Sequence, residues 1–212
     1  MKNAIIFDLD GTLWDSAKPV TDSWNVVLAK HPESNDCKIS VSDMHGFMGK
    51  QMFDIAALMM PDVEEQRRRA IMLECMDFEL DFLEEHKPVL YPKLSETLEI
   101  LAERFKLIIV SNCQDGYIQL FLRQSKTERF FCDFESYGKT GLSKGENIKL
   151  VIERNSIDKA VYLGDTQGDL ESADFAGIEF IHAAYGFGKT NRDTLKISAF
   201  SDLPKICGEI FT

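Results

Sequence analysis

The chain has 212 residues, of which 44% are hydrophobic and 28% are charged, and its formal net charge is −11 at pH 7. This length and apolar content are typical of a globular protein with one sizeable core and room for a smaller inserted domain. The acidic balance disfavours binding to nucleic acid, whose phosphates would be repelled. No apolar stretch approaches the roughly 20 residues that span a bilayer, and the N-terminal residues lack a signal-peptide pattern. We therefore expect a cytoplasmic protein without a membrane partner.

The first predicted element is a strand over residues 4–7, whose bulky apolar sequence is typical of a strand buried on both faces. Asp8 and Asp10 follow it, and Gly11 and Thr12 complete the motif. At a spacing of two, both carboxylates point to the same side of an extended chain and repel each other unless a cation lies between them. Mg²⁺ takes oxygen ligands and needs only one or two carboxylates besides a substrate phosphate. The motif indicates a catalytic acid pair, although a plain acidic turn has the same composition.

A helical insertion is predicted over residues 15–90. Apolar residues recur at helical spacing in three segments, residues 20–28, 52–60 and 71–82. Pro61 ends the second of these segments. The core domain is then expected at residues 1–14 and 91–212.

Helices and strands alternate after Pro92. Helical spacing is found over residues 94–105, 118–122 and 148–152, and strand patterns are found over residues 106–110, 160–163 and 178–181. This alternation predicts an α/β fold with a Rossmann-like parallel sheet. We expect the strand that precedes Asp8 near its centre, between the strands over residues 106–110 and 160–163.

Polar side chains follow two of these later strands. Ser111 and Asn112 offer a hydroxyl and an amide that can donate hydrogen bonds to a phosphoryl oxygen. Asp165 and Asp169, in the sequence Gly-Asp-Thr-Gln-Gly-Asp, bring two further carboxylates. A turn or a helix cap is the alternative interpretation of the first pair.

Lys144 is the candidate for a positive charge at the site. It lies between Ser143 and Gly145, directly before a helical segment. Lys139 is the competing lysine, but it lacks both the glycine-flanked loop and the helix that follows. A lysine beside a glycine is usually only a solvated surface residue.

Together these motifs resemble those of the haloacid dehalogenase-like hydrolase superfamily, in particular its helical-capped phosphatases of the phosphoglycolate phosphatase and β-phosphoglucomutase type. The resemblance covers nearly the whole chain. It rests on four motifs in the family's order, Asp8-Leu9-Asp10-Gly11-Thr12-Leu13, Ser111-Asn112, Lys144 and Gly164-Asp165-Thr166-Gln167-Gly168-Asp169. It implies that the inserted helices form a cap, and that the enzyme hydrolyses a small phosphate monoester metabolite.

The resemblance also implies roles for individual residues. Asp8 would attack phosphorus and form an aspartyl-phosphate intermediate, while Asp10 would protonate the leaving oxygen and then activate water. Ser111 would bind a phosphoryl oxygen, and Lys144 would neutralise charge on the nucleophile and the phosphate. The remaining phosphate-binding residues would be Gly11, Thr12 and Asn112.

The implied cofactor is Mg²⁺. Its ligands would be the Asp8 carboxylate, the Asp10 backbone carbonyl and Asp165, and Asp169 would support it directly or through water. Phosphoryl transfer needs positioning and neutralisation of spreading negative charge, which a metal ion and a lysine both provide.

The segment from His45 to Lys50 resembles the substrate-specificity loop of similar capped phosphatases, because glycines and a cation precede a helix there. His45 or Lys50 could contact an acidic group on the leaving part of the substrate. A turn between helices with an exposed lysine fits the same residues equally well.

Three other functions are alternatives to a phosphatase. A dehalogenase of this fold would not need the second acid, Asp10. A β-phosphoglucomutase-like phosphomutase shares the acid pair, but this cap segment departs from the mutase's glycine-then-arginine pattern. A phospho-acceptor regulatory domain is about half this length, carries its acceptor on a later strand and lacks a cap.

The five cysteines lie without metal-ligand spacing, and their odd number argues against a disulfide framework. Cys113 follows Ser111-Asn112, but no adjacent cation or helix N-terminus is evident that would favour a thiolate. An inert side chain is therefore the expectation there.

Overall fold

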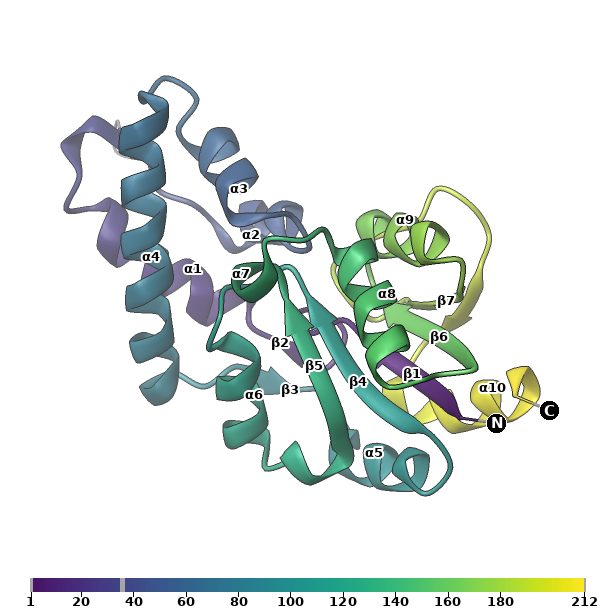
Figure 1. Ribbon diagram of the computed structural model, residues 1–212. Helices are drawn as coiled ribbons and strands as arrows, with labels where there is room; N and C mark the ends of the chain where they lie inside the picture. The colour runs from purple at the N-terminus through teal and green to yellow at the C-terminus, as the bar shows by residue number, and fades with distance from the viewer. Residues whose placement is uncertain (1, 35–36, 212) are drawn as a thin grey trace.

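The computed structural model describes residues 2–34 and 37–211 and contains a parallel six-stranded sheet with a lobe of helices beside it (Figure 1). The strands of this sheet are β1 (Asn3–Phe7), β4 (Lys106–Ser111), β5 (Phe131–Ser136), β6 (Lys159–Gly164), β7 (Glu179–Ala183) and β8 (Leu195–Ile197). Their order is β5-β4-β1-β6-β7-β8, and each neighbouring pair is parallel. The predicted α/β fold is confirmed, with β1 between the strands that lead to Ser111 and Asp165.

The central position of β1 explains its apolar sequence. Ala4 and Ile6 belong to the core cluster on the face covered by helices α8 (Lys144–Arg154) and α9 (Gln167–Ala176). Ile5 and Phe7 belong to the cluster on the other face. Residues 4–7 are fully buried. A strand with apolar layers on both sides has no solvent face that would require polar residues.

The helices outside the lobe cover both faces of the sheet or lie beside it (Figure 1). They are α5 (Leu94–Ala102), α6 (Tyr117–Ser125), α7 (Tyr137–Thr140), α8 (Lys144–Arg154), α9 (Gln167–Ala176) and α10 (Leu203–Ile210). Short 3-10 turns lie at Glu128–Phe130 and Phe200–Asp202, and another lies within the lobe at Pro32–Ser34. The helix predicted over residues 94–105 ends at Ala102, and Phe105 packs into the core from the turn that follows.

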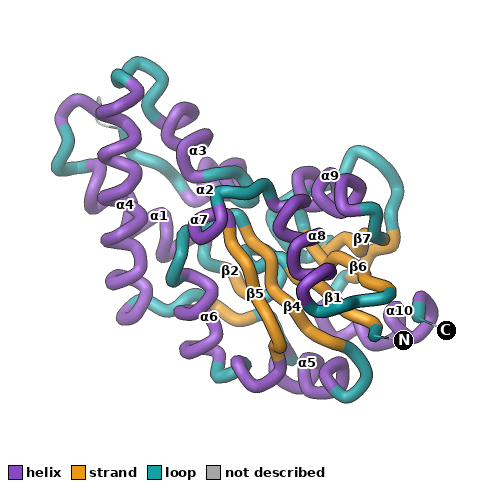
Figure 2. Tube along the Cα trace, in the orientation of Figure 1, coloured by secondary structure: helices purple, strands orange, loops and turns teal. Residues whose placement is uncertain are grey.

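Four helices form the lobe at one end of the molecule. They are α1 (Ala17–Leu28), α2 (Val41–Phe47), α3 (Met52–Met59) and α4 (Glu65–Glu85). The long helix α4 packs along α1, and α3 lies against α4 (Figure 2). The three predicted helices are present, and α2 is an additional one. Its N-terminus is fixed by a capping box in which Ser40 and Asp43 exchange hydrogen bonds.

The two segments that join the lobe to the sheet pair with each other. β2 (Trp14–Asp15) and β3 (Val89–Leu90) form a short antiparallel ribbon, in which Trp14 lies opposite Leu90. The chain thus enters and leaves the helical lobe through two neighbouring segments. We refer to α1 to α4 as the cap. No helix in the described part of the chain is both long and apolar enough to cross a membrane.

Candidate active site

Asp8 lies directly after β1, at the carboxyl edge of the sheet. Its backbone N–H donates a hydrogen bond to the carbonyl of Leu163, 2.8 Å away, which anchors the residue to β6. Its carboxylate is 2% exposed and accepts a hydrogen bond from Lys144 Nζ at 2.8 Å. Burial, with the nearby charge of Asp169, raises the pKa of Asp8 to about 7, although Lys144 opposes the rise. A buried carboxylate in this setting is stabilised by added positive charge.

Lys144 is the first residue of α8. The helix is started by a capping box between Ser143 and Glu146, which fixes the chain just before the lysine. Its ammonium lies 2.8 Å from Asp8 and 2.5 Å from Asp169. Burial alone would lower the pKa of Lys144, but the two carboxylates outweigh it and raise that pKa well above the usual value.

The competing lysine lies elsewhere. Lys139, on α7, is half exposed and lies 3.7 Å from the buried Glu135. The structure therefore places Lys144, and not Lys139, beside Asp8.

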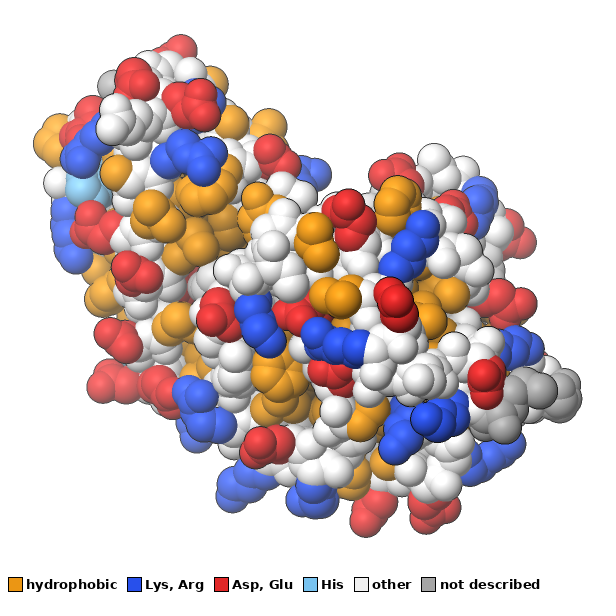
Figure 3. Space-filling view, in the orientation of Figure 1, with side chains coloured by type: hydrophobic (Ala, Val, Ile, Leu, Met, Phe, Trp, Pro, Cys, Tyr) orange, Lys and Arg blue, Asp and Glu red, His pale blue; other side chains and the backbone are white. Residues whose placement is uncertain are grey.

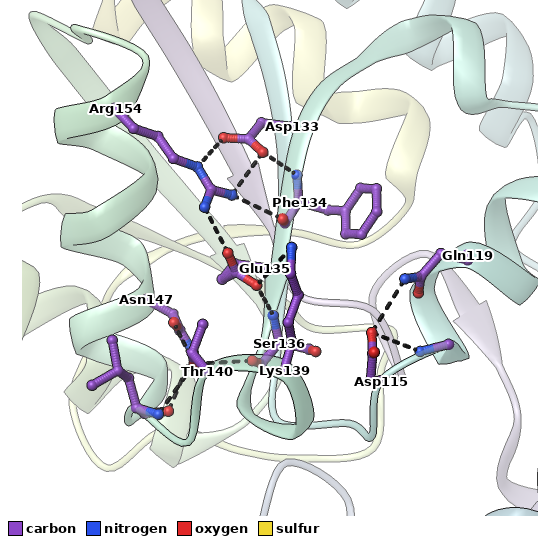
Figure 4. A network of polar contacts seen from close by, with 12 residues as sticks. Asp115, Gln119, Asp133, Phe134, Glu135, Ser136, Lys139, Thr140, Asn147 and Arg154 are labelled. Carbon is purple, nitrogen blue, oxygen red and sulfur yellow. Dashed lines mark hydrogen bonds and ion pairs between the residues drawn. The ribbon is translucent and has the colours of Figure 1, made fainter.

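The helix that carries Lys144 is tied to the sheet at its far end. Arg154, in the last turn of α8, forms ion pairs with Asp133 and Glu135 of β5, each at 2.6 Å (Figure 4). Near the other end, Asn147 accepts a hydrogen bond from the last residue of α7. These contacts fix the position of α8 relative to β5, and they thereby help to fix the position of the Lys144 ammonium.

Asp165 follows β6 and is held by a loop beyond β7. One carboxylate oxygen, Oδ2, accepts hydrogen bonds from the backbone N–H groups of Phe187 and Gly188, at 2.7 and 3.2 Å. The other oxygen, Oδ1, is buried without a partner among the described residues. Burial and the charges of Asp169 and Asp8 raise the pKa of Asp165 well above its usual value.

The loop that holds Asp165 needs glycine. A Cβ on Gly186 would come within 2.4 Å of both the Gly11 carbonyl oxygen and the Asp165 Cβ. Gly11 itself has φ +82°, and a Cβ there would lie 2.4 Å from Asp165 Oδ2. Backbone and carboxylate therefore approach each other more closely than any side chain allows. Sequence reasoning did not assign this loop to the site, although Gly186 and Gly188 after the strand were the available signal.

Asp169 has all of its carboxylate oxygens engaged. Oδ1 accepts from Lys144, while Oδ2 accepts from the backbone N–H groups of Asp165 and Thr166 and from the Thr166 hydroxyl. These contacts also make the capping box of α9. The geometry suits a residue that positions Lys144, and it is less suited to direct metal ligation.

The donor set at this edge fits a divalent cation. One carboxylate oxygen each from Asp8, Asp165 and Asp169 lies within 4.8 Å of the others, and all three residues are buried. Among the residues that the structure describes, only Lys144 forms ion pairs with these carboxylates, and Oδ1 of Asp165 has no partner there. Hard cations such as Mg²⁺ are bound by carboxylate oxygens of this kind.

Asp10 occupies a different environment from Asp8. Its Oδ1 accepts hydrogen bonds from Trp14 Nε1 at 2.8 Å, from the Tyr117 hydroxyl at 2.9 Å and from the Ser16 hydroxyl. Burial raises the pKa of Asp10, and the three donors partly oppose it. A carboxyl group that retains its proton more readily than usual is suited to protonating a leaving group.

The predicted phosphate-binding residues follow β1 and β4 in the chain, and each has different partners. Ser111 ends β4 and is buried, as is the hydroxyl of Thr12, which has no hydrogen-bond partner among the described residues. Asn112 donates from Nδ2 to the backbone carbonyl of Gly49 in the cap, at 2.8 Å. In this arrangement the amide of Asn112 connects core and cap, whereas we expected it at a phosphate.

The expectation of a loop from His45 to Lys50 is wrong in its first half, because α2 extends to Phe47. His45 lies in the last turn of that helix, and its ring stacks on Phe187 of the core with centroids 4.8 Å apart. The capping box at Ser40 extends the helix through a segment whose glycine favoured a turn. Lys50 is exposed at the rim of the cavity between cap and core.

The cavity between cap and core has a volume of about 40 Å³. On the core side it is bounded by catalytic candidates and their neighbours, namely Asp8, Asp10, Ser111, Asn112, Cys113 and Tyr117. On the cap side the lining is Val20, Trp24, Met44, Phe47, Met48, Gly49, Lys50, Met52, Ile55 and Glu79. The outer surface is notched between the two lobes, and charges of both signs are interspersed around the notch (Figure 3). Burial raises the pKa of Cys113, in keeping with an inert thiol.

Comparison with known proteins identifies the family of this chain. Residues 5–183 match the family of haloacid dehalogenase-like hydrolases. The chain is 28% identical over 213 residues to the phosphoglycolate phosphatase of Aquifex aeolicus (strain VF5), covering 95% of each chain. It is 26% identical over 219 residues to the pyrophosphatase PpaX of Bacillus pumilus (strain SAFR-032), covering 97% of this chain and 96% of that one.

A solved structure shows the same fold. A haloacid dehalogenase-like family hydrolase from Streptococcus pneumoniae superposes with a TM-score of 0.78 at 19% identity, covering 100% of this chain and 99% of that one. The family match includes Asp8, Ser111, Lys144 and Asp165, which the structure gathers at one edge of the sheet. The chain therefore belongs to the haloacid dehalogenase-like hydrolase family of enzymes, as its motifs predicted.

Proposed function

We propose that this protein is a Mg²⁺-dependent phosphatase that hydrolyses a small phosphate monoester through an aspartyl-phosphate intermediate. The observation that carries the proposal is the arrangement around Asp8. Its carboxylate contacts the ammonium of Lys144 and lies within 4.8 Å of carboxylate oxygens of Asp165 and Asp169. A nucleophile held beside a fixed cation and a candidate metal site fits phosphoryl transfer.

In the first step, an oxygen of Asp8 attacks phosphorus while the bond to the leaving oxygen breaks. Asp10 donates its proton to that oxygen, and the substrate alcohol departs. In the second step, Asp10 takes a proton from water, which attacks phosphorus and releases phosphate with Asp8 regenerated. The raised pKa of Asp10 suits the first of these roles.

The other residues would bind charge and hold geometry. Lys144 neutralises negative charge on Asp8 and on the transferring phosphoryl group, and Ser111 donates a hydrogen bond to a phosphoryl oxygen. Mg²⁺, held by Asp8, Asp165 and the Asp10 carbonyl, would supply further positive charge and orient the phosphate. In this scheme Asp169 fixes Lys144 through their 2.5 Å contact.

Substrate entry would move the cap. The cavity of about 40 Å³ has room for a few water molecules, which is small for a phosphorylated metabolite. The contacts that close it include the Asn112 to Gly49 hydrogen bond and the stacking of His45 on Phe187. We propose that these contacts break on substrate entry and re-form to exclude bulk water during the reaction.

Phosphate release from a panel of monoesters tests the proposal. The wild-type protein should release inorganic phosphate with Mg²⁺, lose that activity in chelator and regain it when Mg²⁺ is restored. Asp77→Asn, an exposed charge removal on α4, is the matched control and should behave as wild type. Absence of Mg²⁺-dependent release across sugar phosphates, phosphoglycolate, nucleotides and nitrophenyl phosphate would refute the proposal. Recovery of an isomeric phosphate ester without free phosphate would identify a phosphomutase instead.

A further inference from the structure

Glu79 is a buried carboxyl group in the wall of the cavity, on the cap side. It lies on α4, is 1% exposed, and lines the same space as Asp8 and Ser111. The cap residues around it are mostly apolar, among them Val20, Met44, Phe47, Met52 and Ile55. The proposed mechanism gives this acid no role.

Each carboxylate oxygen of Glu79 accepts one hydrogen bond from the protein. Oε2 accepts from Trp24 Nε1 of α1, and Oε1 accepts from Gln114 Nε2 of the core at 2.9 Å. Both donors are neutral groups. Each oxygen keeps a second lone pair, so the carboxylate can accept a further hydrogen bond from a ligand in the cavity.

When Glu79 is ionised, its charge has no counterpart among the described residues. No lysine, arginine or histidine of the described chain forms an ion pair with it, and the nearby acid Asp10 adds charge of the same sign. Burial raises the pKa of Glu79 to about 8. Carboxylates removed from water are normally paired with a cation.

We infer that Glu79 selects a substrate whose leaving alcohol carries a protonated amine on a short apolar carbon chain. The inference rests on the proposed function, since it places the leaving group in the cavity above Asp8. The apolar cap residues would contact the carbon chain. Glu79 would release its proton as the amine binds, and the resulting carboxylate would pair with the ammonium. A leaving group with an anion at the same position would bind poorly, because it would lie against the Glu79 carboxyl group and apolar side chains.

Lys50 does not change this assignment. It is exposed at the rim, where its ammonium remains in water, while Glu79 is enclosed. Charge selection is stronger at the enclosed position, because water screens an exposed charge. A second, anionic group on the same substrate could still reach Lys50 without approaching Glu79.

The test measures binding of phosphonates, which carry a non-hydrolysable phosphorus–carbon bond, to the wild-type protein in Mg²⁺ by calorimetry. The probes are 2-aminoethyl- and 3-aminopropylphosphonate, their uncharged isosteres propyl- and butylphosphonate, and carboxymethylphosphonate. The better aminoalkyl compound should bind about tenfold or more tightly than its isostere, the fold-change expected of a charge-assisted contact. Carboxymethylphosphonate should bind more weakly than that aminoalkyl compound and its isostere.

Glu79→Gln should remove the preference for the amine while leaving the affinity for the uncharged isosteres nearly unchanged. Asp77→Asn, on the same helix and exposed, should keep the wild-type order. A structural role of Glu79 alone would shift all affinities together. Equal binding of amine and isostere by the wild-type protein, or tighter binding of carboxymethylphosphonate, would overturn the inference even if Glu79→Gln fails to fold. Nitrophenyl phosphate hydrolysis is measured in parallel, so that failure of the proposed phosphatase activity is distinguished from failure of this inference.

Discussion

Replacing Glu79 by glutamine should change how the stability of the protein depends on pH. The side chain is 1% exposed, and its two hydrogen-bond donors, Trp24 and Gln114, are neutral. Burial raises its pKa from 4.5 to about 8, against the opposing effect of these donors. The folded protein thus holds a proton at Glu79 over a pH range in which the unfolded chain has released it.

The sign and size of the effect follow from this pKa. Below pH 4.5 both states hold the proton, so the group contributes no pH dependence. As pH rises from 4.5 to about 8, the folded state loses about 1.4 kcal/mol of stability per pH unit. Full ionisation of Glu79 therefore costs on the order of 5 kcal/mol, and Glu79→Gln removes that cost.

The assay is urea denaturation of the wild-type protein, Glu79→Gln and Asp77→Asn at pH 5 and pH 9, at one fixed Mg²⁺ concentration. Asp8 and Asp165 titrate in all three proteins, so their contributions cancel in the difference between variant and wild type. Glu79→Gln should gain on the order of 4 kcal/mol relative to wild type between the two pH values, and Asp77→Asn should gain nothing. A difference in unfolding free energy that stays constant with pH would refute the reasoning.

The remaining predictions concern activity. Asp8→Asn should abolish Mg²⁺-dependent phosphate release, because an amide is no nucleophile, and measurable turnover of nitrophenyl phosphate by this variant would contradict the mechanism. Asp10→Asn should lower kcat by roughly 10²- to 10⁴-fold for alkyl phosphates and less for nitrophenyl phosphate; equal losses in the two assays would exclude an acid role. Lys144→Met should lower kcat by roughly 10²-fold or more at saturating Mg²⁺, and an unchanged rate would remove the lysine from the mechanism. Lys50→Ala should raise KM by up to about fivefold for esters with a second anion, because water screens an exposed charge, and should leave nitrophenyl phosphate unaffected; identical kinetics would make Lys50 a solvated turn residue.

The sequence alone predicted the part of the fold that periodicity encodes. A strand buried on both faces has a continuous apolar run, so β1, β4 and β6 were found. β5 was missed because its sequence, Phe-Cys-Asp-Phe-Glu-Ser, is neither a continuous apolar run nor a regular alternation, and β8 was missed because it has only three residues.

The site divides in the same way. Polar residues at strand ends were visible as Asp8, Ser111 and Asp165, because a parallel sheet gathers them at one edge. Glu79 was not, since a glutamate in an acidic helix is normally solvated. Its burial depends on Trp24, far away in the chain, and on Gln114 in the core. No local pattern encodes contacts of that range.

The placement of β1 at the centre of the sheet has a consequence for how the enzyme assembles. β1 is synthesised before its partners, because its neighbours in the sheet begin at Lys106 and Lys159. The cap helices, which lie between β1 and β4 in the chain, contact one another and can form before β4 is synthesised. The apolar strand β1 has no partner in the sheet until then. Pairing over such separations is slow and leaves apolar segments open to aggregation. Asp8 therefore reaches Asp165 only when β6 joins the sheet, so catalytic competence arises late in folding, and no N-terminal fragment that ends before β6 can possess it.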